Sequence, residues 1–329
     1  MKAAFYTEVG SARDVLQVAD LPRPSAAAGE VLVRVYASGV NPSDVKARAG
    51  RRAGASGLPW PHIIPHSDGA GVIEAVGSGV DPARVGQRVW LWNGQWQRPY
   101  GTAAEYIALP SAQAVPLPES TGYAEAACLG IPALTAHRCV HADGPIAGQT
   151  VLVTGGAGTV GRYAIQMAKL AGAQVITTVS GPEKAAHARS AGADHVINYR
   201  DQDVIAQVRS ITGNEGVHRI IDVEFGDNIA VTTELIANNG TIVSYGSAKV
   251  MSPQLPFYPL MFKAVTIRLV LIYILPEAER ATAIADLTGL LETGQLSHAV
   301  AEQFPLHDIA SAHESVERAE KLGSVVVTL

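Results

Sequence analysis

The sequence predicts an α/β protein that combines a β-rich part with a doubly wound parallel sheet. Two observations favour this fold class. Short apolar runs separated by Gly and Pro dominate residues 1–123, and from residue 150 onward segments with strand and helix patterns alternate. A third observation is the stretch "GGAGTVG" at 155–161, which lies between a predicted strand and a predicted helix. Together they predict two domains, in keeping with a length of 329 residues.

The first part is predicted to be mostly β-structure. Its apolar runs are "VLVRVYA" (31–37), "AGVIEAVG" (70–77), "RVWLW" (88–92) and "AAEYIAL" (103–109). Such short runs with turn residues between them are typical of a barrel or a sandwich. Residues 124–144 then predict a helix that Pro132 breaks or kinks.

From residue 150 the predicted order is strand, helix, strand, helix. Strands are expected at 150–155 and 174–180, and helices at 160–172 and 182–192, with Pro182 in the first turn of the latter. The stretches "HVINYR", "HRIIDVEF" and "TIVSYGS" predict further strands, and helices are expected around 203–212 and 228–238. Short connections between alternating elements indicate βαβ units and a parallel sheet covered on both faces.

The last part of the chain is predicted to return to the first domain. The apolar run 264–275 is interrupted by Arg268, is too short to span a bilayer, and is expected to be a strand buried on both faces. A helix at 277–293, a strand, a helix at 308–322 and the final strand "SVVVTL" follow. A lone strand needs a sheet to join, so we expect this tail to add to the β-rich domain.

Composition limits the function. Hydrophobic residues make up 47% and charged residues 17%, with a net charge of −5, which argues against binding to nucleic acid as the main task. The N-terminus has no apolar core of a signal peptide, and no membrane association is expected. The cysteines, Cys128 and Cys139, offer no disulfide framework, so we expect a cytoplasmic protein.

The glycine-rich stretch predicts a dinucleotide site. Gly156, Gly158 and Gly161 satisfy the G-x-G-x-x-G spacing between a strand and a helix. We expect Gly156 to permit the tight turn, Gly158 to let the backbone approach a pyrophosphate, and Gly161 to let the helix pack closely on the strand. The helix N-terminus would then face the phosphates. The alternative is a glycine-rich turn with no ligand.

The end of the second strand of the parallel sheet predicts NADPH. An NAD site usually has Asp or Glu there, whereas this strand ends "TTVSG", with the neutral Ser180 and then Lys184. A hydroxyl and an ammonium group would accept a 2′-phosphate. The alternative is that Lys184 is a solvated helix charge, and the neighbouring Glu183 partly offsets its field.

At this point the chain resembles a known family, the medium-chain dehydrogenase/reductase superfamily, in its zinc-free quinone oxidoreductase branch, which includes zeta-crystallin. The resemblance rests on "ASGVNPSDVKARAG", "HSDGAGVIEAVGSGVDPARVGQRV", "GTAAEYIALP", "LGIPALTAH", the glycine loop, "VSGPEK" and "VINYR", and covers nearly the whole chain. It implies a GroES-like catalytic domain at 1–123 and 273–329, with a Rossmann dinucleotide-binding domain at 124–272 inserted.

The resemblance also bears on metal. Zinc-dependent relatives have a cysteine where this chain has Asn41 and a histidine where it has Ser67, and the four cysteines of their structural lobe are missing around 92–101. The pairs His62/His66 and His137/His141 suggest no third ligand, so no zinc is expected. Many relatives have an aromatic residue and a glycine where this chain has Lys46 and His66, and we expect both near the mouth of the cleft.

The matching motif positions imply a set of site residues. Asn41 and Asp44 of "GVNPSD" are expected beside the nicotinamide as catalytic residues, although Asn41 could be only a turn residue and Asp44 only a helix-capping carboxylate. Tyr199 is expected with Lys184 at the 2′-phosphate, its alternative being an ordinary aromatic at a strand end. The expected cofactor-binding residues are Asn41, Thr135, Gly156, Ala157, Gly158, Thr159, Val160, Ser180, Gly181, Lys184, Tyr199, Tyr245, Gly246 and Ser247.

These expectations combine into a predicted function. NADPH would deliver a hydride to a quinone or an α,β-unsaturated carbonyl, which are acceptors that need no Lewis acid. The alternatives are an alkenal or enoyl reductase with little quinone activity, and a non-catalytic NADPH-binding protein of the crystallin or RNA-interacting kind. A homodimer is expected through the edge strand near 265–275, as is common in the family.

Overall fold

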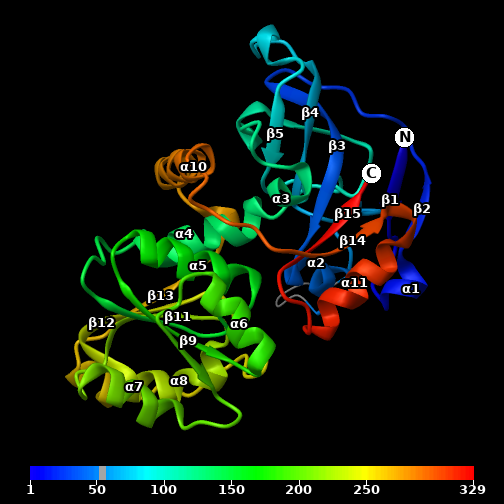
Figure 1. Ribbon diagram of the computed structural model, residues 1–329. Coiled ribbons are helices and arrows are strands. Elements are labelled where there is room, and N and C mark those ends of the chain that lie inside the picture. The colour runs from blue at the N-terminus through cyan, green and yellow to red at the C-terminus, as the bar shows by residue number, and fades with distance from the viewer. Residues whose placement is uncertain (52–56) are drawn as a thin grey trace. The chain divides into compact units, whose positions relative to one another are not determined.

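The computed structural model describes residues 1–51 and 57–329, and the chain forms two compact units. Unit 1 comprises Met1–Ile131 and Ile284–Leu329, and unit 2 comprises Pro132–Ala283. Figure 1 shows the elements of both units along the chain. Each unit has its own sheet and its own hydrophobic core, and each is described by itself below.

Unit 1 is built on a seven-stranded sheet with the order β14-β15-β3-β4-β5-β7, and β6 pairs with β3 beside this path. The strands are β3 (Glu30–Val40), β4 (Asp68–Val76), β5 (Arg88–Leu91), β6 (Tyr106–Pro110), β7 (Ala114–Pro116), β14 (Val300–Pro305) and β15 (Ser324–Thr328). β15 lies parallel to β14 and antiparallel to β3, with Val325 opposite Val40. The expected return of the C-terminal strand to the first domain is confirmed.

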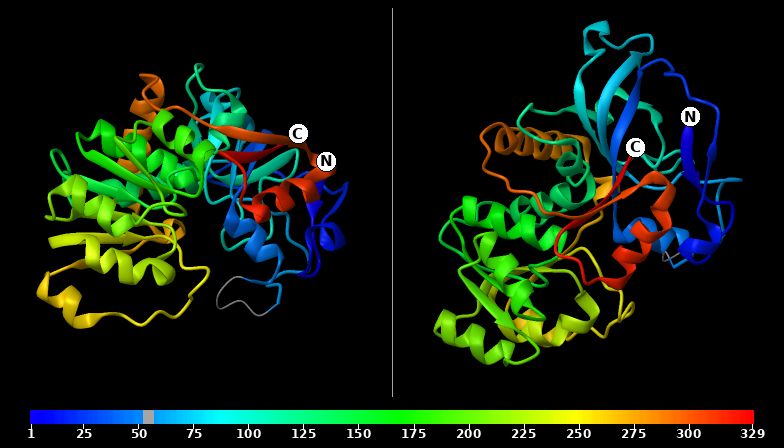
Figure 2. Two further views of the ribbon diagram at one scale, coloured as in Figure 1. Left: turned by 60° about the horizontal axis from the view of Figure 1, so that its bottom comes forward. Right: turned by 45° about the vertical axis from the view of Figure 1, so that its right-hand side comes forward.

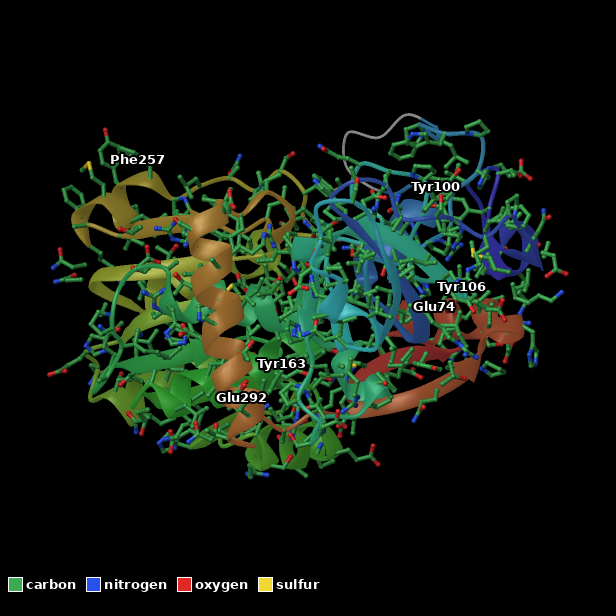
Figure 3. All side chains as sticks on the ribbon, turned by 90° about the horizontal axis from the view of Figure 1, so that it is seen from above. Glu74, Tyr100, Tyr106, Tyr163, Phe257 and Glu292 are labelled. Atoms are coloured by element: carbon green, nitrogen blue, oxygen red, sulfur yellow. The ribbon has the colours of Figure 1, made fainter. Side chains whose placement is uncertain are left out.

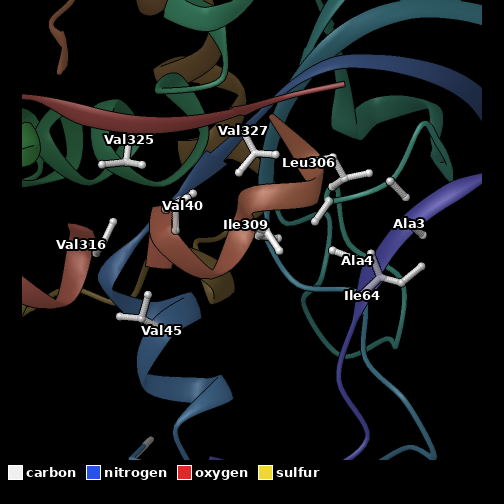
Figure 4. Packing of buried hydrophobic residues seen from close by; sticks show 13 residues of the cluster. Ala3, Ala4, Val40, Val45, Ile64, Leu306, Ile309, Val316, Val325 and Val327 are labelled. Atoms are coloured by element: carbon white, nitrogen blue, oxygen red, sulfur yellow. The ribbon is translucent and has the colours of Figure 1, made fainter. Parts of the chain in front are cut away.

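The remaining elements of unit 1 cover this sheet. They are the pair β1 (Lys2–Phe5) and β2 (Gln17–Asp20), the helices α1 (Ala12–Val15), α2 (Pro42–Arg48), α3 (Tyr123–Ala126) and α11 (Ile309–Arg318), and the 3-10 turns η1 (Pro82–Arg84), η2 (Ser111–Gln113) and η5 (Leu306–Asp308). Figure 4 shows one core cluster, in which Val40, Val45, Ile309 and Val325 pack together. Because these residues come from both ends of the chain, the two ends form one core.

The segment around Pro132 is helical but not one continuous α-helix. The chain runs through α3, a π-helical segment η3 (Leu129–Ala133) that contains Pro132, and α4 (Leu134–His141). Proline cannot donate to an i→i−4 bond, so the regular pattern is interrupted where the sequence predicts a break. The boundary between the two units falls between Ile131 and Pro132.

Unit 2 is a doubly wound α/β fold. Its six-stranded parallel sheet has the order β10-β9-β8-β11-β12-β13, from β8 (Thr150–Val153), β9 (Gln174–Val179), β10 (His195–Asn198), β11 (Val217–Asp222), β12 (Ile236–Ser244) and β13 (Thr266–Leu269). The helices α5 (Thr159–Leu170) and α6 (Pro182–Ser190) lie on one face, and α7 (Val204–Thr212) and α8 (Phe225–Leu235) on the other (Figure 1). This is the Rossmann order, with the direction of winding reversing between β8 and β11.

The remaining elements follow β12 in the chain. They are α9 (Phe257–Phe262), the 3-10 turn η4 (Ile272–Ile274) and the long α10 (Glu277–Glu292), the last drawn in orange in Figure 2. Within residues 1–51 and 57–329 no helix is both long enough and apolar enough to cross a membrane. Cys128 and Cys139 are buried free thiols, and burial raises the pKa of each to about 12.

The expectation that residues 264–275 form a strand buried on both faces is wrong. Only β13 is extended, followed by η4. β13 is the edge strand of the sheet, so the edge strand expected near 265–275 is confirmed. Leu269 is 75% exposed and Ile274 is 65% exposed. An apolar run alone does not distinguish a central strand from an edge strand whose outer face carries apolar side chains.

Candidate functional site

The glycine loop lies where β8 ends and α5 begins. The backbone N–H of Gly158 donates to the carbonyl of Gly155 at 2.9 Å, which closes a tight turn, and Gly158 is the N-cap of α5. Thr159 and Val160 form the first turn of this helix and are half-buried, while Ala157 is buried. The first-turn N–H groups of a helix have no partner within the helix, so this loop has the geometry of an anion-binding site.

Two different structural constraints require glycine in this loop. A Cβ on Gly156 would lie 2.0 Å from the Thr177 hydroxyl oxygen, and one on Gly161 would lie 2.5 Å from the Gly155 carbonyl oxygen. Close packing therefore requires both, as expected for Gly161. The expectation that Gly156 permits the turn is wrong, because the left-handed residue is Gly155, with φ of 66°.

The sequence analysis missed a polar pair below this loop. The Thr154 hydroxyl at the end of β8 donates to Asp222 Oδ1 at the end of β11, with a distance of 2.6 Å. Both residues are buried. Polar residues after two neighbouring parallel strands meet at one edge of a sheet, so the order β8-β11 could have predicted this pair.

The residues expected at the 2′-phosphate come together at the carboxyl end of β9. Ser180 follows β9 directly and is half-buried, and Lys184 is the third residue of α6. The backbone N–H of Tyr199 donates to the Val179 carbonyl at 3.0 Å, which brings Tyr199 beside this strand end with 53% of its surface exposed. Lys184 has no ion-pair partner in the described part of the chain, and Gly181 is extended with φ of 170°.

The loop after β12 is fixed by α8. The Ser247 hydroxyl accepts from the Gly226 N–H at 2.9 Å, and the Gly246 carbonyl accepts from the Phe225 N–H at 2.8 Å. The Tyr245 N–H donates to the Asp222 carbonyl at 3.2 Å, and burial raises the pKa of the Tyr245 phenol. The expected residue Thr135 is buried in α4. Tyr245, Gly246 and Ser247 therefore lie at the same edge of the sheet as the glycine loop.

The residues expected to be catalytic lie in unit 1. Asn41 is the N-cap of α2, between β3 and Pro42, and its backbone N–H donates to Asp44 Oδ2 at 2.8 Å. Both side chains are only 6% exposed. Asn41 and Asp44 therefore do cap the helix, as the alternative interpretation proposed. The capping also fixes both side chains at the start of the helix.

A third polar residue, which the sequence analysis did not single out, holds Asn41. Asp68 is completely buried at the start of β4, and its Oδ2 accepts from Asn41 Nδ2 at 2.8 Å and from the Ile131 N–H at 2.9 Å. Burial raises the pKa of the Asp68 carboxyl well above its usual value, although these two hydrogen bonds oppose the rise. The position of Asp68 in "HSDGAG", directly after Ser67, is the sequence signal that could have identified it as a site residue.

The donor set around these residues does not fit a tetrahedral zinc site. Asn41 and Ser67 supply an amide and a hydroxyl, and the described residues contain no group of three or more His, Cys, Asp or Glu side chains able to hold a metal ion. His62 and His66 flank an irregular segment, as expected, whereas His137 and His141 lie within α4. The expectation that His66 lies at a cleft mouth is wrong because His66 is fully buried by the packing of unit 1; Lys46 is exposed.

One open pocket, of about 510 Å³, lies elsewhere. It is lined by Arg209, His218, Glu234 and Lys263 at the amino ends of β11 and β12. That edge of the sheet is opposite to the edge with the glycine loop, and the pocket contains none of the expected site residues.

Two family models match the chain. The alcohol dehydrogenase GroES-like domain matches residues 27–119, and the zinc-binding dehydrogenase model matches residues 159–288. A quinone oxidoreductase of Pseudomonas aeruginosa is 32% identical, with 95% of each chain covered. Among solved structures, a mycobacterial protein complexed with NADPH has a TM-score of 0.89 at 30% identity over the full length of both chains. Quinone oxidoreductase of Escherichia coli complexed with NADPH has a TM-score of 0.88 at 27% identity, again over both full chains.

The GroES-like sheet and the parallel Rossmann sheet define the class of a two-domain dehydrogenase. More specifically, the chain belongs to the medium-chain dehydrogenase/reductase superfamily of oxidoreductases, in its quinone oxidoreductase branch.

Proposed function

We propose that the protein is an NADPH-dependent oxidoreductase that reduces quinones or α,β-unsaturated carbonyl compounds without zinc. The observation that carries the proposal is the grouping of Ser180, Lys184 and Tyr199 at the carboxyl end of β9, beyond the glycine loop. The proteins of known structure from Escherichia coli and mycobacteria, which are similar over the full chain, were solved with NADPH.

The choice of NADPH over NADH rests on charge. A carboxylate at the end of β9 would repel a 2′-phosphate, whereas this chain has Ser180 there and the Lys184 ammonium in the first turn of α6. Hydrogen bonds between charged groups are roughly twice as strong as neutral ones. In this proposal Gly156, Ala157, Gly158, Thr159 and Val160 hold the pyrophosphate, and Thr135, Tyr245, Gly246 and Ser247 line the nicotinamide side.

NADPH supplies a hydride when it is bound. The residues of the chain orient the cofactor and the acceptor, and they polarise the acceptor. Asn41 is suited to orienting, because one of its amide hydrogens goes to Asp68 at 2.8 Å and the amide cannot rotate without losing this bond. Its second amide hydrogen is then available to the oxygen of an acceptor or to the carboxamide. Asp44 fixes the backbone of Asn41 through the hydrogen bond from its N–H.

Zinc independence is supported by the donor set and by chemistry. Although one matching family model is that of zinc-binding dehydrogenases, Asn41 and Ser67 stand where zinc-dependent relatives have ligands. Simple ketones depend more strongly on a Lewis acid or a positioned proton donor to stabilise negative charge on oxygen. A quinone needs little such help because its reduction produces an aromatic ring, and an enone spreads the charge by conjugation.

A direct test measures the oxidation of NADPH and NADH by absorbance, with 1,4-quinones, enones, alkenals and simple ketones as acceptors. We expect turnover of the quinones or enones with NADPH, unaffected by chelators. Absence of turnover with every acceptor would refute the enzyme proposal, and faster turnover with NADH would refute the cofactor assignment.

The same assay separates two other functions. A kcat/KM for alkenals or enoyl thioesters far above that for quinones would identify an alkenal or enoyl reductase. NADPH binding without any turnover would support a non-catalytic, crystallin-like protein. An RNA-interacting role would require salt-sensitive RNA binding, and the acidic net charge of −5 argues against it.

We also propose that the protein is a homodimer that pairs through β13. Edge strands expose unpaired backbone groups, and apolar edges need to be covered. Seven exposed apolar residues of unit 2 lie on α9 and along β13 and η4: Phe257, Tyr258, Met261, Phe262, Leu269, Leu271 and Ile274. Figure 3 shows Phe257 at the outer margin of this unit. A second copy of the same strand would cover these side chains by two-fold symmetry.

A further inference from the structure

Two histidines meet inside unit 1. The Nε2 atoms of His66 and His313 are 2.9 Å apart, and the ring planes differ by only 24° with centroids 5.1 Å apart. Neither residue has any solvent exposure. His66 directly precedes Ser67 and Asp68 in the chain, whereas His313 is on α11.

Each hydroxyl group has only one proton to donate, and this fixes the direction of the hydrogen bonds that lead from His66 to Asp68. The Thr102 hydroxyl donates its only proton to the backbone carbonyl of Asp68, at 2.6 Å. The Ser38 hydroxyl, 2.7 Å from Thr102 Oγ1, must therefore donate its proton to Thr102. Ser38 Oγ is also 2.8 Å from His66 Nδ1, so it accepts from an Nδ1–H of His66.

The same count assigns the tautomers of both rings. Burial lowers the pKa of His66 to about 3, so this ring is neutral and carries one proton, on Nδ1. Its Nε2 is then an acceptor and receives the Nε2–H of His313. Burial also keeps His313 neutral, which leaves its Nδ1 as a bare acceptor, buried and without a hydrogen-bond partner in the described part of the chain.

This chain of donors ends at the residue that holds Asn41. Thr102 fixes the backbone of Asp68, and the carboxyl group of Asp68 fixes the Asn41 amide at 2.8 Å. The other end of α2 is tied as well, because Arg48 donates to the Gly10 carbonyl and forms an ion pair with Glu317. The helix that begins at Asn41 is therefore held at both of its ends.

The strained backbone conformation of His66 supports a specific role for its imidazole ring. His66 has φ of 76°, in the left-handed region that favours glycine, and a non-glycine residue is held there at a cost in free energy. In this chain the backbone carries an imidazole that completes a hydrogen-bonded connection from α11 to β4.

We propose that His66 and His313 are positioning residues. Their one-directional chain of hydrogen bonds, from His313 through His66, Ser38 and Thr102 to Asp68, fixes the Asn41 amide for reaction. The kinetic part of this inference rests on the proposed function, whereas the protonation pattern and the fixed amide do not.

The first test reads the tautomers directly. Protein labelled with ¹⁵N at histidine is recorded by long-range ¹H–¹⁵N NMR, and the signals are assigned from the spectra of His66→Asn and His313→Gln. We expect His66 to carry its proton on Nδ1 and His313 to carry its proton on Nε2. A proton on Nε2 of His66 would overturn the direction of the chain, and with it the proposal.

The second test compares two substitutions of His313. The amide nitrogen of Gln reaches the position of Nε2 and can donate to His66, whereas the shorter Asn cannot. With the proposed reaction, we expect His313→Asn to lower kcat about tenfold, because small displacements of a catalytic group slow a reaction by up to a hundredfold. The KM for NADPH should stay unchanged, and His313→Gln should retain the wild-type kcat.

A readout without turnover keeps this inference separable from the proposed function. The side-chain amide signal of Asn41, assigned by its loss in Asn41→Asp, should shift or broaden in His313→Asn and stay in place in His313→Gln. If His313→Asn fails to fold, Ser38→Ala interrupts the same chain by removing one oxygen atom. An unchanged Asn41 signal in the interrupted variant, or equal effects of Gln and Asn at position 313, would refute the positioning role even in an inactive protein.

Discussion

Thr154 and Asp222 join two strands of unit 2 at the point where the sheet reverses its direction of winding. The Thr154 hydroxyl donates to Asp222 Oδ1 at 2.6 Å and accepts from the Val223 N–H at 3.1 Å. Asp222 Oδ1 also accepts from Asn228 Nδ2 at 2.8 Å, so the pair connects β8, β11 and α8. Because the glycine loop follows Thr154 directly, this connection holds the base of the candidate cofactor site.

Removing the Thr154 hydroxyl should destabilise unit 2. Thr154→Val leaves the part-buried Val223 N–H and the buried Asp222 carboxyl each without one partner, and we expect a loss of about 1–3 kcal/mol in the free energy of unfolding. The measurement is urea unfolding followed by far-UV circular dichroism. Thr154→Ser keeps the hydroxyl and is the matched control; equal stability of Thr154→Val and Thr154→Ser would contradict the prediction.

Lys184 should discriminate between the two nicotinamide cofactors. For Lys184→Ala we expect a loss of about 1.5–3 kcal/mol in NADPH binding, because charge-assisted contacts to the 2′-phosphate are removed. This corresponds to an increase of roughly 10- to 150-fold in the Kd for NADPH, with the Kd for NADH unchanged. Fluorescence titration measures both constants. Arg189→Ala, at an exposed position of the same helix, is the control, and equal effects on both cofactors would argue against the assigned pocket.

The buried histidines should make unit 1 sensitive to acid. Burial lowers the pKa of His66 to about 3 and also lowers the pKa of His313, which the nearby Arg48 lowers further. In the unfolded chain both rings bind a proton near pH 6.5, so folding stability is complete above this pH and is lost as the pH falls toward 3. The slope is at most about 1.4 kcal/mol per pH unit for each histidine.

Tryptophan fluorescence can follow this loss, because Trp60, Trp90, Trp92 and Trp96 all lie in unit 1. We expect the urea midpoint of the wild type to fall more steeply between pH 6 and pH 4 than that of His313→Gln. His195→Gln, in unit 2, should show the wild-type slope. Identical slopes for the wild type and His313→Gln would show that His313 does not titrate in this way.

The apolar edge of unit 2 should determine the oligomeric state. Leu269 is 75% exposed on β13, and Leu269→Glu would place a charge in the proposed interface. By light scattering coupled to size exclusion we expect a dimer for the wild type and a monomer for this variant. Leu170→Glu changes an apolar residue that is 48% exposed on α5 and should remain dimeric. A monomeric wild type would refute the proposal.

Local patterns predicted much of this structure. Strand and helix periods with short links predicted the parallel sheet, and Gly161 was correctly assigned to close packing because the G-x-G-x-x-G spacing describes one continuous segment. The neighbouring Gly155 shows where such reasoning ends. Which of two adjacent glycines takes the left-handed conformation depends on contacts with Thr178 and Val223, and these come from other strands.

Residues whose environment is made by distant segments could not be placed in this way. His66 precedes β4 in an irregular stretch that resembles a surface loop, and α11, almost 250 residues later, buries it. Asp68 is likewise buried by Asn41 and Ile131, which are remote from it in the chain. The apolar run around β13 allowed both a strand buried on both faces and an edge strand, and only the observed strand order distinguishes them.

The position of β15 constrains the order in which the two units can fold during synthesis. β15 lies between β14 and β3, so the sheet of unit 1 stays divided until residues 324–328 have been synthesised. Unit 2 is continuous in the chain and can fold earlier, as domains generally fold as units during synthesis. On the ribosome, a nascent chain would therefore possess the candidate cofactor site before Asn41 and Asp68 have their final support.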